Sequence, residues 1–469
     1  MRRVFVSVCV LVALSCPVAP SPAQVVPPSL VASSRQLLRD LIGINTAEPD
    51  GNTTTAATRV ADVLKAAGFA AEDVQVIGAD ARRGNVVARL AGRGPGKPIL
   101  FLAHLDVVPA LREDWTTDPY TLVEKDGYYY GRGTTDDKQF AAIFAAVFAQ
   151  LKREGFVPDR DLVLALTTGE ESGADETANG VMWLLKHHRP LIDAAYVING
   201  DAGGGMIASD GRYLGYGVQA AEKLYADFTL EATHDGGHSS RPVKGNPIYR
   251  IVRALSRVET LALPLKVGPV TQPFLAFLAT TESGQKAADL RAAAATPPDP
   301  SALSKLADED PSLNAQLRTT CVATQMTAGH APNALPQRAR ANVNCRILPG
   351  ETPAAIRAAL VTAIDDTAVS VTQTEGVQHA PLVRLDPAVM ALITRAAGVV
   401  WPGVPVVPVL EVGASDGLFF RELGVDVYGV YHFERDEDKR AHGKDERIGF
   451  KQFDEAARFS YELAKIIGR

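Results

Sequence analysis

Long apolar runs alternate with helical patterns over much of this chain. Residues 97–108, 161–169, 194–200 and 425–433 are nearly continuous apolar segments, which is typical of strands that are covered on both faces. Residues 136–155 repeat apolar positions at helical spacing and end at a glycine. This alternation predicts an α/β fold with a mostly parallel sheet. In such sheets, functional groups gather outside the carboxyl ends of the strands.

The pattern changes near residue 216. Residues 225–235 and 338–347 alternate apolar and polar positions, as half-exposed antiparallel strands do. Residues 246–261 have the spacing of an amphipathic helix. The stretch 270–315 is rich in Ala, Pro, Asp and Ser, so we expect an insertion with short helices there.

These changes divide the chain into segments. The α/β pattern returns after about residue 380, and a chain of 469 residues is too long for one ordinary core. A second domain is therefore expected to be inserted into the first. The predicted segments are a signal peptide at 1–23, a main α/β domain in two parts at 24–215 and 379–469, and an inserted α+β domain at 216–378.

The charge and composition limit the classes of partner. The chain is 46% hydrophobic and 22% charged, as is usual for a globular protein, and its formal net charge is -6. An acidic protein is poorly suited to bind nucleic acid or an anionic membrane surface, so neither is expected as the main partner.

The first residues have the pattern of a targeting segment. Arg2 and Arg3 precede an apolar core at 4–14, and Ser21-Pro22-Ala23 forms a small-x-small cleavage site. The apolar core is too short for a bilayer-spanning helix, so we predict no integral membrane span. Export to a periplasm or to the outside is expected. The alternative is a lipid anchor at Cys16, which Ala13 disfavours because such sites usually carry Leu there.

Two cysteines would remain in the mature chain. Cys321 and Cys345 flank a hairpin-like segment, and their midpoint, Asn333, lies in the turn signal HAPNALP. The two could therefore lie opposite each other on paired strands. An oxidising compartment would permit a disulfide. Two buried free thiols are the alternative, because many cross-strand cysteine pairs have unsuitable geometry.

Metal-type side chains follow the ends of several apolar runs. A dinuclear zinc hydrolase needs roughly three protein ligands per metal, one of them shared, and a free carboxylate to act on water. The chain supplies this set in five short segments that are far apart in the sequence, at His104, Asp136, Glu170 with Glu171, Asp201 and His442.

These segments carry a resemblance that covers nearly the whole mature chain. The chain resembles the M20 family of dinuclear zinc peptidases and amidohydrolases, which includes carboxypeptidases, dipeptidases and aminoacylases. The matching blocks occur in family order, and they are HLDVVP, GRGTTDDK, GEESG, GDAGGG, GGHSSRP, PNALP with NCRILPGET, GASDG and HGKDER. The resemblance implies a mostly parallel-sheet zinc-peptidase catalytic domain with an inserted α+β lid of the dimerisation type.

The resemblance assigns roles to the metal-type residues. Asp136 would bridge two Zn²⁺, with His104 and Asp201 completing one site. Glu171 and His442 would complete the other. The peptide bond from Asp136 to Asp137 resembles the family's cis peptide step.

Asp106 is expected to support one of these ligands. It stands two residues after His104, so its carboxylate would accept the second imidazole N–H and fix the ring tautomer. An N-cap or loop role is the alternative.

Glu170 is expected to be the general base. Two consecutive glutamates cannot easily reach the same metal, so one would bind zinc and its neighbour would stay free for the water. The alternative, two solvated acids in an exposed turn, fits GEESG alone but not the set of ligands around it.

The remaining candidates follow mainly from the resemblance. His238 matches a histidine that stabilises the developing oxyanion, although a lone His beside Ser and Gly is more often structural. Asn333 and Arg346 match lid positions that bind the substrate's carbonyl or carboxylate, and a strand-edge ion pair is the alternative for Arg346. Ser415 and Asp416 match the pocket wall, with a plain Gly-rich turn as the alternative.

The expected function is that of an exported zinc exopeptidase or N-acyl amino acid hydrolase. The long insertion and the residues of the DVVP and GRGTTDDK motifs favour members of the carboxypeptidase S type. A catalytically silent peptide-binding protein is the alternative from another class, but a binder has no use for the free base Glu170. Co²⁺ or Mn²⁺ would be accepted substitutes for zinc. A homodimer through the inserted domain is implied by the resemblance, and the insertion at 270–315 could block that contact.

Overall fold

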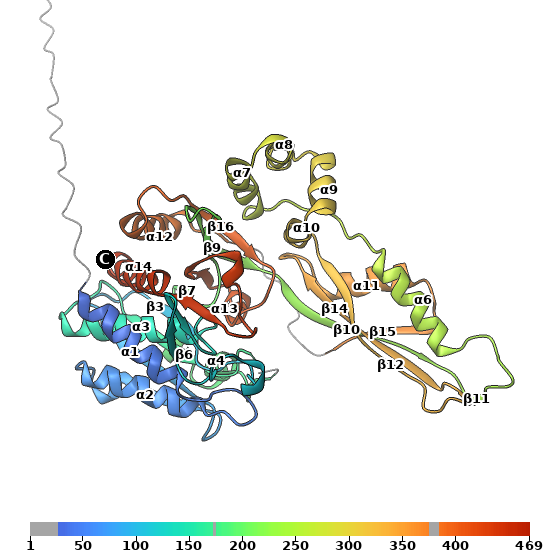
Figure 1. The fold of residues 1–469 in the computed structure, drawn as a ribbon, viewed down its shortest axis with the longest axis horizontal. Helices are drawn as coiled ribbons and strands as arrows, with labels where there is room; N and C mark the ends of the chain where they lie inside the picture. The colour runs from blue at the N-terminus through green and yellow to red at the C-terminus, as the bar shows by residue number, and fades with distance from the viewer. Residues whose placement is uncertain (1–26, 172–174, 375–383) are drawn as a thin grey trace, which may run out of the picture.

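The computed structural model describes residues 27–171, 175–374 and 384–469. They form a large α/β part and an elongated second part that projects from it (Figure 1). The predicted leader, with Cys16 and the cleavage site, lies outside the described residues. Among the described helices, none is both long and apolar enough to cross a lipid bilayer.

The large part is built on a central sheet whose middle strands are parallel. Its strand order is β1-β2-β6-β3-β7-β17-β9-β8-β18, with β16 paired to β9. The pairs that join β6, β3, β7 and β17 are parallel, as the continuous apolar runs predicted. The strands are β1 Val74–Gly78, β2 Gly84–Leu90, β3 Ile99–His104, β6 Leu162–Thr167, β7 Tyr196–Asn199, β8 Gly204–Ile207, β9 Tyr213–Glu222, β16 Val406–Glu411, β17 Asp426–Gly429 and β18 Phe433–Glu434.

Helices cover both faces of this sheet, which is why its central strands are apolar throughout. The larger apolar cluster joins one face to α1 Pro28–Ile42, α2 Thr53–Ala66, α3 Lys138–Arg153, α12 Pro387–Val400 and α14 Phe450–Ile467. A second cluster joins the other face to α4 Gly180–His187, α5 Arg189–Ile192 and α13 Gly417–Glu422. A small sheet contains β4 Val123–Lys125, β5 Tyr128–Tyr130 and β19 Arg447–Gly449. It joins a strand from the C-terminal region, β19, to two strands from the N-terminal region.

The projecting part, here called the lid, contains a four-stranded antiparallel sheet in the order β12-β14-β10-β15. One face packs on two helices, and the other carries the polar residues of the alternating pattern. A two-stranded ribbon, β11 with β13, lies at its far end (Figure 1). The elements are β10 Leu224–Thr233, β11 Gly237–His238, α6 Pro247–Glu259, β12 Thr320–Ala328, β13 Ala334–Leu335, β14 Arg338–Ile347, α11 Pro353–Ile364 and β15 Val369–Gln373.

The stretch 270–315 forms short helices, as its composition led us to expect. They share an apolar cluster of their own. We call this group the helical insertion, and its helices are α7 Thr271–Thr281, α8 Gly284–Ala293, α9 Pro300–Glu309 and α10 Pro311–Leu317.

The predicted change of pattern at residue 216 falls inside a strand. β9 continues in the large sheet to Glu222, and the lid sheet begins at Leu224. The large sheet takes up another strand, β16, from the last part of the chain. The division into domains at 215 and 378 stays a prediction, and the structure puts the change of sheet at residue 223.

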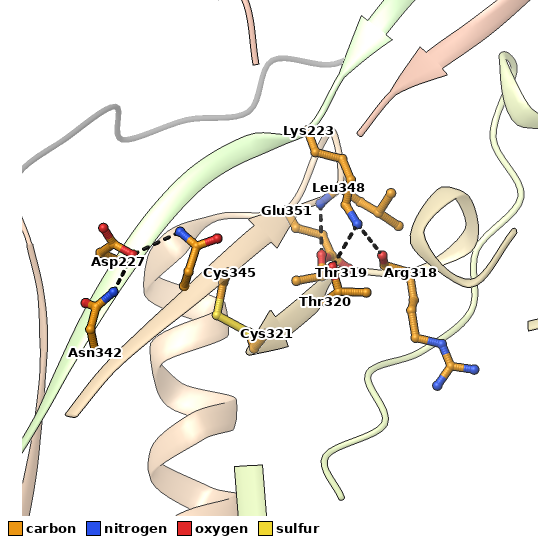
Figure 2. Close-up of a disulfide and its surroundings, with 11 residues drawn as sticks. Lys223, Asp227, Arg318, Thr319, Thr320, Cys321, Asn342, Cys345, Leu348 and Glu351 are labelled. Carbon is orange, nitrogen blue, oxygen red and sulfur yellow. Dashed lines mark hydrogen bonds between the residues drawn. A yellow bond between two sulfur atoms is a disulfide. The ribbon is translucent and has the colours of Figure 1, made fainter. Parts of the chain in front are cut away.

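Cys321 and Cys345 are joined by a disulfide that links β12 to β14 (Figure 2). The two residues face each other in the strand register, and Cys345 is fully buried. Of the two alternatives that the sequence left open, the structure therefore has the disulfide.

The disulfide is expected to contribute substantially to lid stability. It closes a loop with a sequence separation of 24 residues, for which the chain-entropy argument gives roughly 3 kcal/mol. In a Cys321→Ser/Cys345→Ser variant, the free energy of unfolding should therefore be lower by about that amount. Urea titration measures the difference, and the variant should unfold at a lower urea concentration. Dithiothreitol should destabilise the native chain and leave the variant unchanged. Equal stability of both proteins in oxidising buffer would contradict this expectation.

Candidate metal centre

The metal-type residues converge at the carboxyl edge of the parallel strands. His104 is the last residue of β3, Glu170 and Glu171 follow β6, and Asp201 follows β7. Because β6, β3 and β7 are adjacent and parallel, their ends meet at one edge of the sheet. The sequence-based expectation of a shared location thus has a simple topological cause.

Asp136 lies between the two histidines. His104 Nε2 is 3.0 Å from Asp136 Oδ1, and His442 Nε2 is 3.0 Å from Asp136 Oδ2. Each carboxylate oxygen thus faces a different imidazole nitrogen. This is the arrangement that a bridging carboxylate needs, because it offers one oxygen to each of two metals.

The other two candidate ligands divide between the two sides. Asp201 Oδ1 is 3.7 Å from His104 Nε2, and Glu171 Oε2 is 2.9 Å from His442 Nε2. The ligand atoms of His104, Asp136 and Glu171 lie within 4.8 Å of one another. The structure therefore brings the five candidate metal ligands close together, and their division between two metals stays a prediction. The Asp136–Asp137 peptide is cis, as expected.

Asp106 is at the expected place but uses a different atom. His104 Nδ1 is 3.0 Å from the main-chain oxygen of Asp106 and 3.6 Å from its carboxylate. The carboxylate instead accepts the main-chain N–H groups of Glu170 and Glu171, at 3.3 and 3.0 Å. Asp106 therefore holds the two glutamates, and its carbonyl oxygen faces the histidine.

Asp137 also lies in the site, although the sequence pointed only to its cis peptide bond with Asp136. It is fully buried, its Oδ2 accepts the main-chain N–H of His104 at 3.3 Å, and a grouping of potential ligand atoms joins it with His104 and Asp201. Its Oδ1 has no hydrogen-bond partner within the described part of the chain. Burial raises the pKa of Asp137 well above its ordinary value. In the sequence, Asp137 appears only as the second Asp of GRGTTDDK. The first Asp of that pair, Asp136, was taken as the candidate ligand.

The crowded carboxylates perturb one another's pKa values. Burial raises the pKa of Asp201 to about 7 and also raises that of Glu171. Burial raises the pKa of Asp136 too, but hydrogen bonds from His104 and His442 bring it below its ordinary value. Hydrogen bonds to Asp136 and Glu171 raise the pKa of His442 to about 10. These opposed shifts identify a site that holds more acid groups than its two imidazoles can balance.

The donors fit a pair of divalent cations. Imidazole nitrogens and carboxylate oxygens are the ligands that zinc takes in catalytic sites. Divalent cations would also offset the repulsion among the buried carboxylates. His104, Asp136 and Asp201 would hold one ion, and Asp136, Glu171 and His442 the other.

Glu170 is the carboxylate left over from this set. Its side chain makes no hydrogen bond to any residue that the structure describes, although its main-chain N–H is held by Asp106. Burial raises the pKa of Glu170 well above its ordinary value, and the nearby Asp201 adds to the effect. A carboxylate in this state is suited to take up and release a proton.

Glu446 holds together the two loops that carry Asp136 and His442, although no sequence pattern pointed to it. Its carboxylate is fully buried and accepts the main-chain N–H groups of Thr135 at 2.7 Å and Asp136 at 3.1 Å. Arg132 Nη1 lies 2.6 Å from the same carboxylate, and Arg132 Nη2 donates to Gly443 O at 3.2 Å. One acid thus fixes the bridging candidate relative to the His442 loop.

Replacing Glu446 by Gln should weaken metal binding without unfolding the chain. The amide would direct N–H groups at main-chain N–H donors, so the loop would shift. We expect roughly 10- to 100-fold weaker zinc binding, as for other residues that orient ligands, measured by competition with a chromophoric chelator. The exposed Glu437→Gln, on the neighbouring loop, should bind zinc normally. Unchanged affinity in Glu446→Gln would contradict the assignment.

Ser415 and Asp416 lie beside the site but are buried supports. Asp416 accepts Thr167 Oγ1 at 3.1 Å and Asn179 Nδ2 at 2.7 Å, and it is 4% exposed. Ser415 Oγ accepts from Asn199 Nδ2 at 3.3 Å. Burial raises the pKa of Asp416 to about 6. Both side chains are therefore engaged within the protein, and their place in the pocket wall stays a prediction.

The lid candidates do not join the site within this chain. His238 lies in β11, at the far end of the lid (Figure 1). Asn333 O accepts the main-chain N–H of Ser239, the residue that follows His238, so Asn333 lies at the same ribbon. Arg346 is the second-last residue of β14, and its guanidinium carbon lies 4.7 Å from the Tyr225 ring centroid. Among the described residues, no carboxylate forms an ion pair with Arg346, whose guanidinium instead lies over the Tyr225 ring.

The family of the chain follows from its sequence match. The sequence model of peptidase family M20/M25/M40 matches residues 100–466, which spans the nominated residues from His104 to His442. The chain belongs to this family. It is therefore an M20-type metallopeptidase or amidohydrolase by descent, with the mixed α/β fold of that family.

Curated relatives of this M20 chain are named for acylated amino acids and for carboxypeptidases. The N-fatty-acyl-amino acid synthase/hydrolase PM20D1 of Homo sapiens is 28% identical over 389 residues, which cover 78% of this chain and 73% of that protein. The probable carboxypeptidase S-like 2 of Dictyostelium discoideum is 27% identical over 385 residues, with 79% and 71% covered.

A solved structure with the same fold is the M20 family metallo-carboxypeptidase Sso-CP2 from Sulfolobus solfataricus. It matches with a TM-score of 0.69 at 17% identity, covering 93% of this chain and 99% of that one. At this identity the likeness establishes the fold of this M20 chain, including the combination of the large sheet with a lid.

Proposed function

We propose that this chain is an exported, dinuclear zinc-dependent hydrolase that cleaves an amide bond next to a free carboxylate. The observation that carries the proposal is Asp136, which presents one oxygen to His104 and the other to His442 while Glu170 stays free beside them. A peptide-binding protein would need neither the shared carboxylate nor the free one.

Glu170 acts as the proton carrier in this proposal. Two zinc ions at the site would lower the pKa of a water molecule and polarise the amide carbonyl. Glu170 takes a proton from that water, whose oxygen forms a bond to the carbonyl carbon. Glu170 then gives the proton to the amine nitrogen as the C–N bond breaks, so one water is consumed and an acid and an amine are formed. Asp106 keeps Glu170 in place through its main-chain N–H.

Once the lid has closed over the metal centre, a free carboxylate on the substrate would be bound by Arg346. The planar guanidinium can form two parallel hydrogen bonds to a carboxylate, and it lies over the Tyr225 ring, 4.7 Å from the ring centroid. Burial lowers the pKa of Arg346, but a guanidinium remains protonated at neutral pH. The names of both curated relatives describe substrates that have a carboxylate near the amide, which agrees with this choice.

His238 and Asn333 would reach the metals only by a rearrangement. We propose that they act either after the lid closes over the substrate or from the lid of a second copy in a homodimer. His238 is exposed, and its Nδ1 accepts the N–H of Ser240 at 3.1 Å, which leaves Nε2 to face an oxyanion. Light scattering of the purified chain, with and without a substrate analogue, distinguishes the two routes.

Export is proposed from two features. Residues 1–23 have the pattern of a signal peptide, and the Cys321–Cys345 disulfide suits an oxidising compartment. Mass spectrometry of the mature N-terminus should find a chain that begins at Gln24. A diacylated chain beginning at Cys16 would show instead that the enzyme is lipid-anchored.

The proposed substrate class is tested with a panel of amides. Dipeptides, N-acetyl and long-chain N-acyl amino acids, and a peptide with a free C-terminus are compared with the same compounds carrying a C-terminal amide. We expect hydrolysis of at least one free acid and a loss of about 10-fold or more in kcat/KM on amidation, because the Arg346 contact is removed. Equal rates for the free acid and the amide would refute the carboxylate requirement, and binding without hydrolysis would favour the silent binder.

A further inference from the structure

Two consecutive buried charged residues occupy the junction between the two sheets. Glu222 ends β9 of the large sheet, Leu224 begins β10 of the lid sheet, and Lys223 stands between them. Glu222 is 3% exposed and Lys223 is fully buried. Because an unpaired buried charge is strongly unfavourable, each side chain must be held by specific partners.

Glu222 is directed into the large part. Its carboxylate accepts the main-chain N–H of Ser415 at 2.8 Å and the Ser415 hydroxyl at 2.9 Å, and Arg421 pairs with the same group. Burial raises the pKa of Glu222, while Arg421 and Ser415 oppose that rise. The Glu222 carboxylate is therefore fully engaged by residues of the large part.

A chain of hydrogen bonds continues from Glu222 to a candidate ligand. Asn199, the last residue of β7, donates through Nδ2 to Ser415 Oγ at 3.3 Å. The Oδ1 of Asn199 accepts the main-chain N–H of Asp201 at 3.4 Å. Glu222 is thus linked to the metal-ligand candidate Asp201 through two intervening side chains.

Lys223 is held by the helical insertion and the lid, and Figure 2 shows its side chain pointing toward Arg318 and Thr320. Its ammonium donates to Ala315 O and Arg318 O at 2.8 Å each and to Thr320 Oγ1 at 3.3 Å. Ala315 lies in α10 of the helical insertion, and Thr320 is the first residue of β12. The Lys223 side chain therefore fastens the end of the insertion to the start of the lid strand.

The Lys223 contacts also support Arg346. Thr320 is paired with Arg346 in the β12–β14 register, and Tyr225, two residues after Lys223, is paired with it from the other side. Glu222 is thus connected by hydrogen bonds to Asp201. Its neighbour Lys223 is connected to the strands beside Arg346.

We propose that Glu222 and Lys223 are positioning residues that set the metal centre and the carboxylate-binding strand of the lid relative to each other. Glu222 orients Asp201 through Ser415 and Asn199, and Lys223 orients the strand pair that presents Arg346. The inference rests on the proposed function for the roles of Asp201 and Arg346. It explains why two charged side chains are buried where a flexible connection would otherwise suffice.

The Glu222 link is tested by zinc titration of the metal-free chain. Glu222→Gln should bind one of two zinc ions about 10-fold more weakly, as expected for loss of a residue that orients a ligand. The matched control is Glu455→Gln, because Glu455 also holds two donors, Tyr213 OH and Trp401 Nε1, but leads to no ligand. Zinc affinity of Glu222→Gln within twofold of the native chain would overturn this link.

The Lys223 link is tested by steady-state kinetics. Lys223→Met should raise KM for a free-acid substrate at least 10-fold while kcat stays within threefold. The substitution disturbs the lid strand that presents Arg346 but leaves the metal centre intact. The control is Lys266→Met, whose side chain is 53% exposed and pairs with Glu351. If Lys223→Met fails to fold, Thr320→Val removes one acceptor and should raise KM less, in the same direction. An unchanged KM, or a fall in kcat at constant KM, would overturn the link.

These arms separate the inference from the function on which it rests. If the native chain hydrolyses none of the panel, the proposed function fails, and the zinc titration of Glu222→Gln still decides the first link. The second is then decided by hydrogen exchange of residues 338–347, which Lys223→Met should accelerate and Lys266→Met should not. Equal exchange in both variants would overturn it.

Discussion

Glu170→Gln is expected to keep both metal ions and lose nearly all turnover. The substitution leaves the main-chain N–H of Glu170 bound to Asp106 and touches none of the candidate ligands. It removes only the group that carries the proton from water to the leaving amine. Loss of a general base reduces rate by about 10²- to 10⁴-fold, so kcat should fall by that factor while KM changes little.

The measurement pairs kinetics with metal analysis on the same preparation. The exposed Glu72→Gln serves as the control for a surface charge change and should keep native activity. Native kcat in Glu170→Gln would refute its assignment as base. A loss of zinc together with activity would show instead that Glu170 is a ligand.

Asp136→Ala is expected to have the largest effect of any single substitution. Asp136 faces both histidines, so its loss removes a ligand from each metal at once. Zinc content should fall below one ion per chain. Zinc affinity should weaken by more than about 100-fold, which is a larger loss than that expected for a residue that only orients a ligand. Elemental analysis after dialysis against a weak chelator measures both.

Two comparisons make the Asp136 result specific. Asp62→Ala, on the exposed side of α2, should retain full metal content and activity. Asp201→Ala should lose metal mainly from the His104 side, because Asp201 lies near that imidazole alone. If Asp136→Ala retained one tightly bound ion and Asp201→Ala retained none, the bridging role would belong to another residue.

The shared location of three candidate ligands could be predicted from the sequence because of how parallel sheets are built. His104, Glu171 and Asp201 each follow an apolar run, and the carboxyl ends of adjacent parallel strands meet at one edge. Asp136 and His442 do not end strands of that kind, and only the resemblance to a family could place them. The change of sheet at residue 223 was placed several residues too early, because β9 stays buried without interruption from Gly215 to Glu222.

The supporting residues could not be predicted, for a different reason. Glu446, Glu222 and Asp137 act through main-chain N–H groups and buried side chains that are distant in sequence. A single acidic residue in a loop carries no periodic signal for such contacts. For the same reason the carboxylate of Asp106 was assigned to the imidazole, whereas it holds the two glutamates.

The most direct test of the account is a zinc titration of the metal-free native chain with amide hydrolysis as the readout. The chain is stripped with a chelator, and hydrolysis of the best free-acid substrate from the panel is followed as zinc is added. The account expects no turnover without metal and a return of activity that saturates at two zinc ions per chain. Undiminished hydrolysis by the stripped chain, or tight substrate binding without hydrolysis at any zinc level, would contradict it.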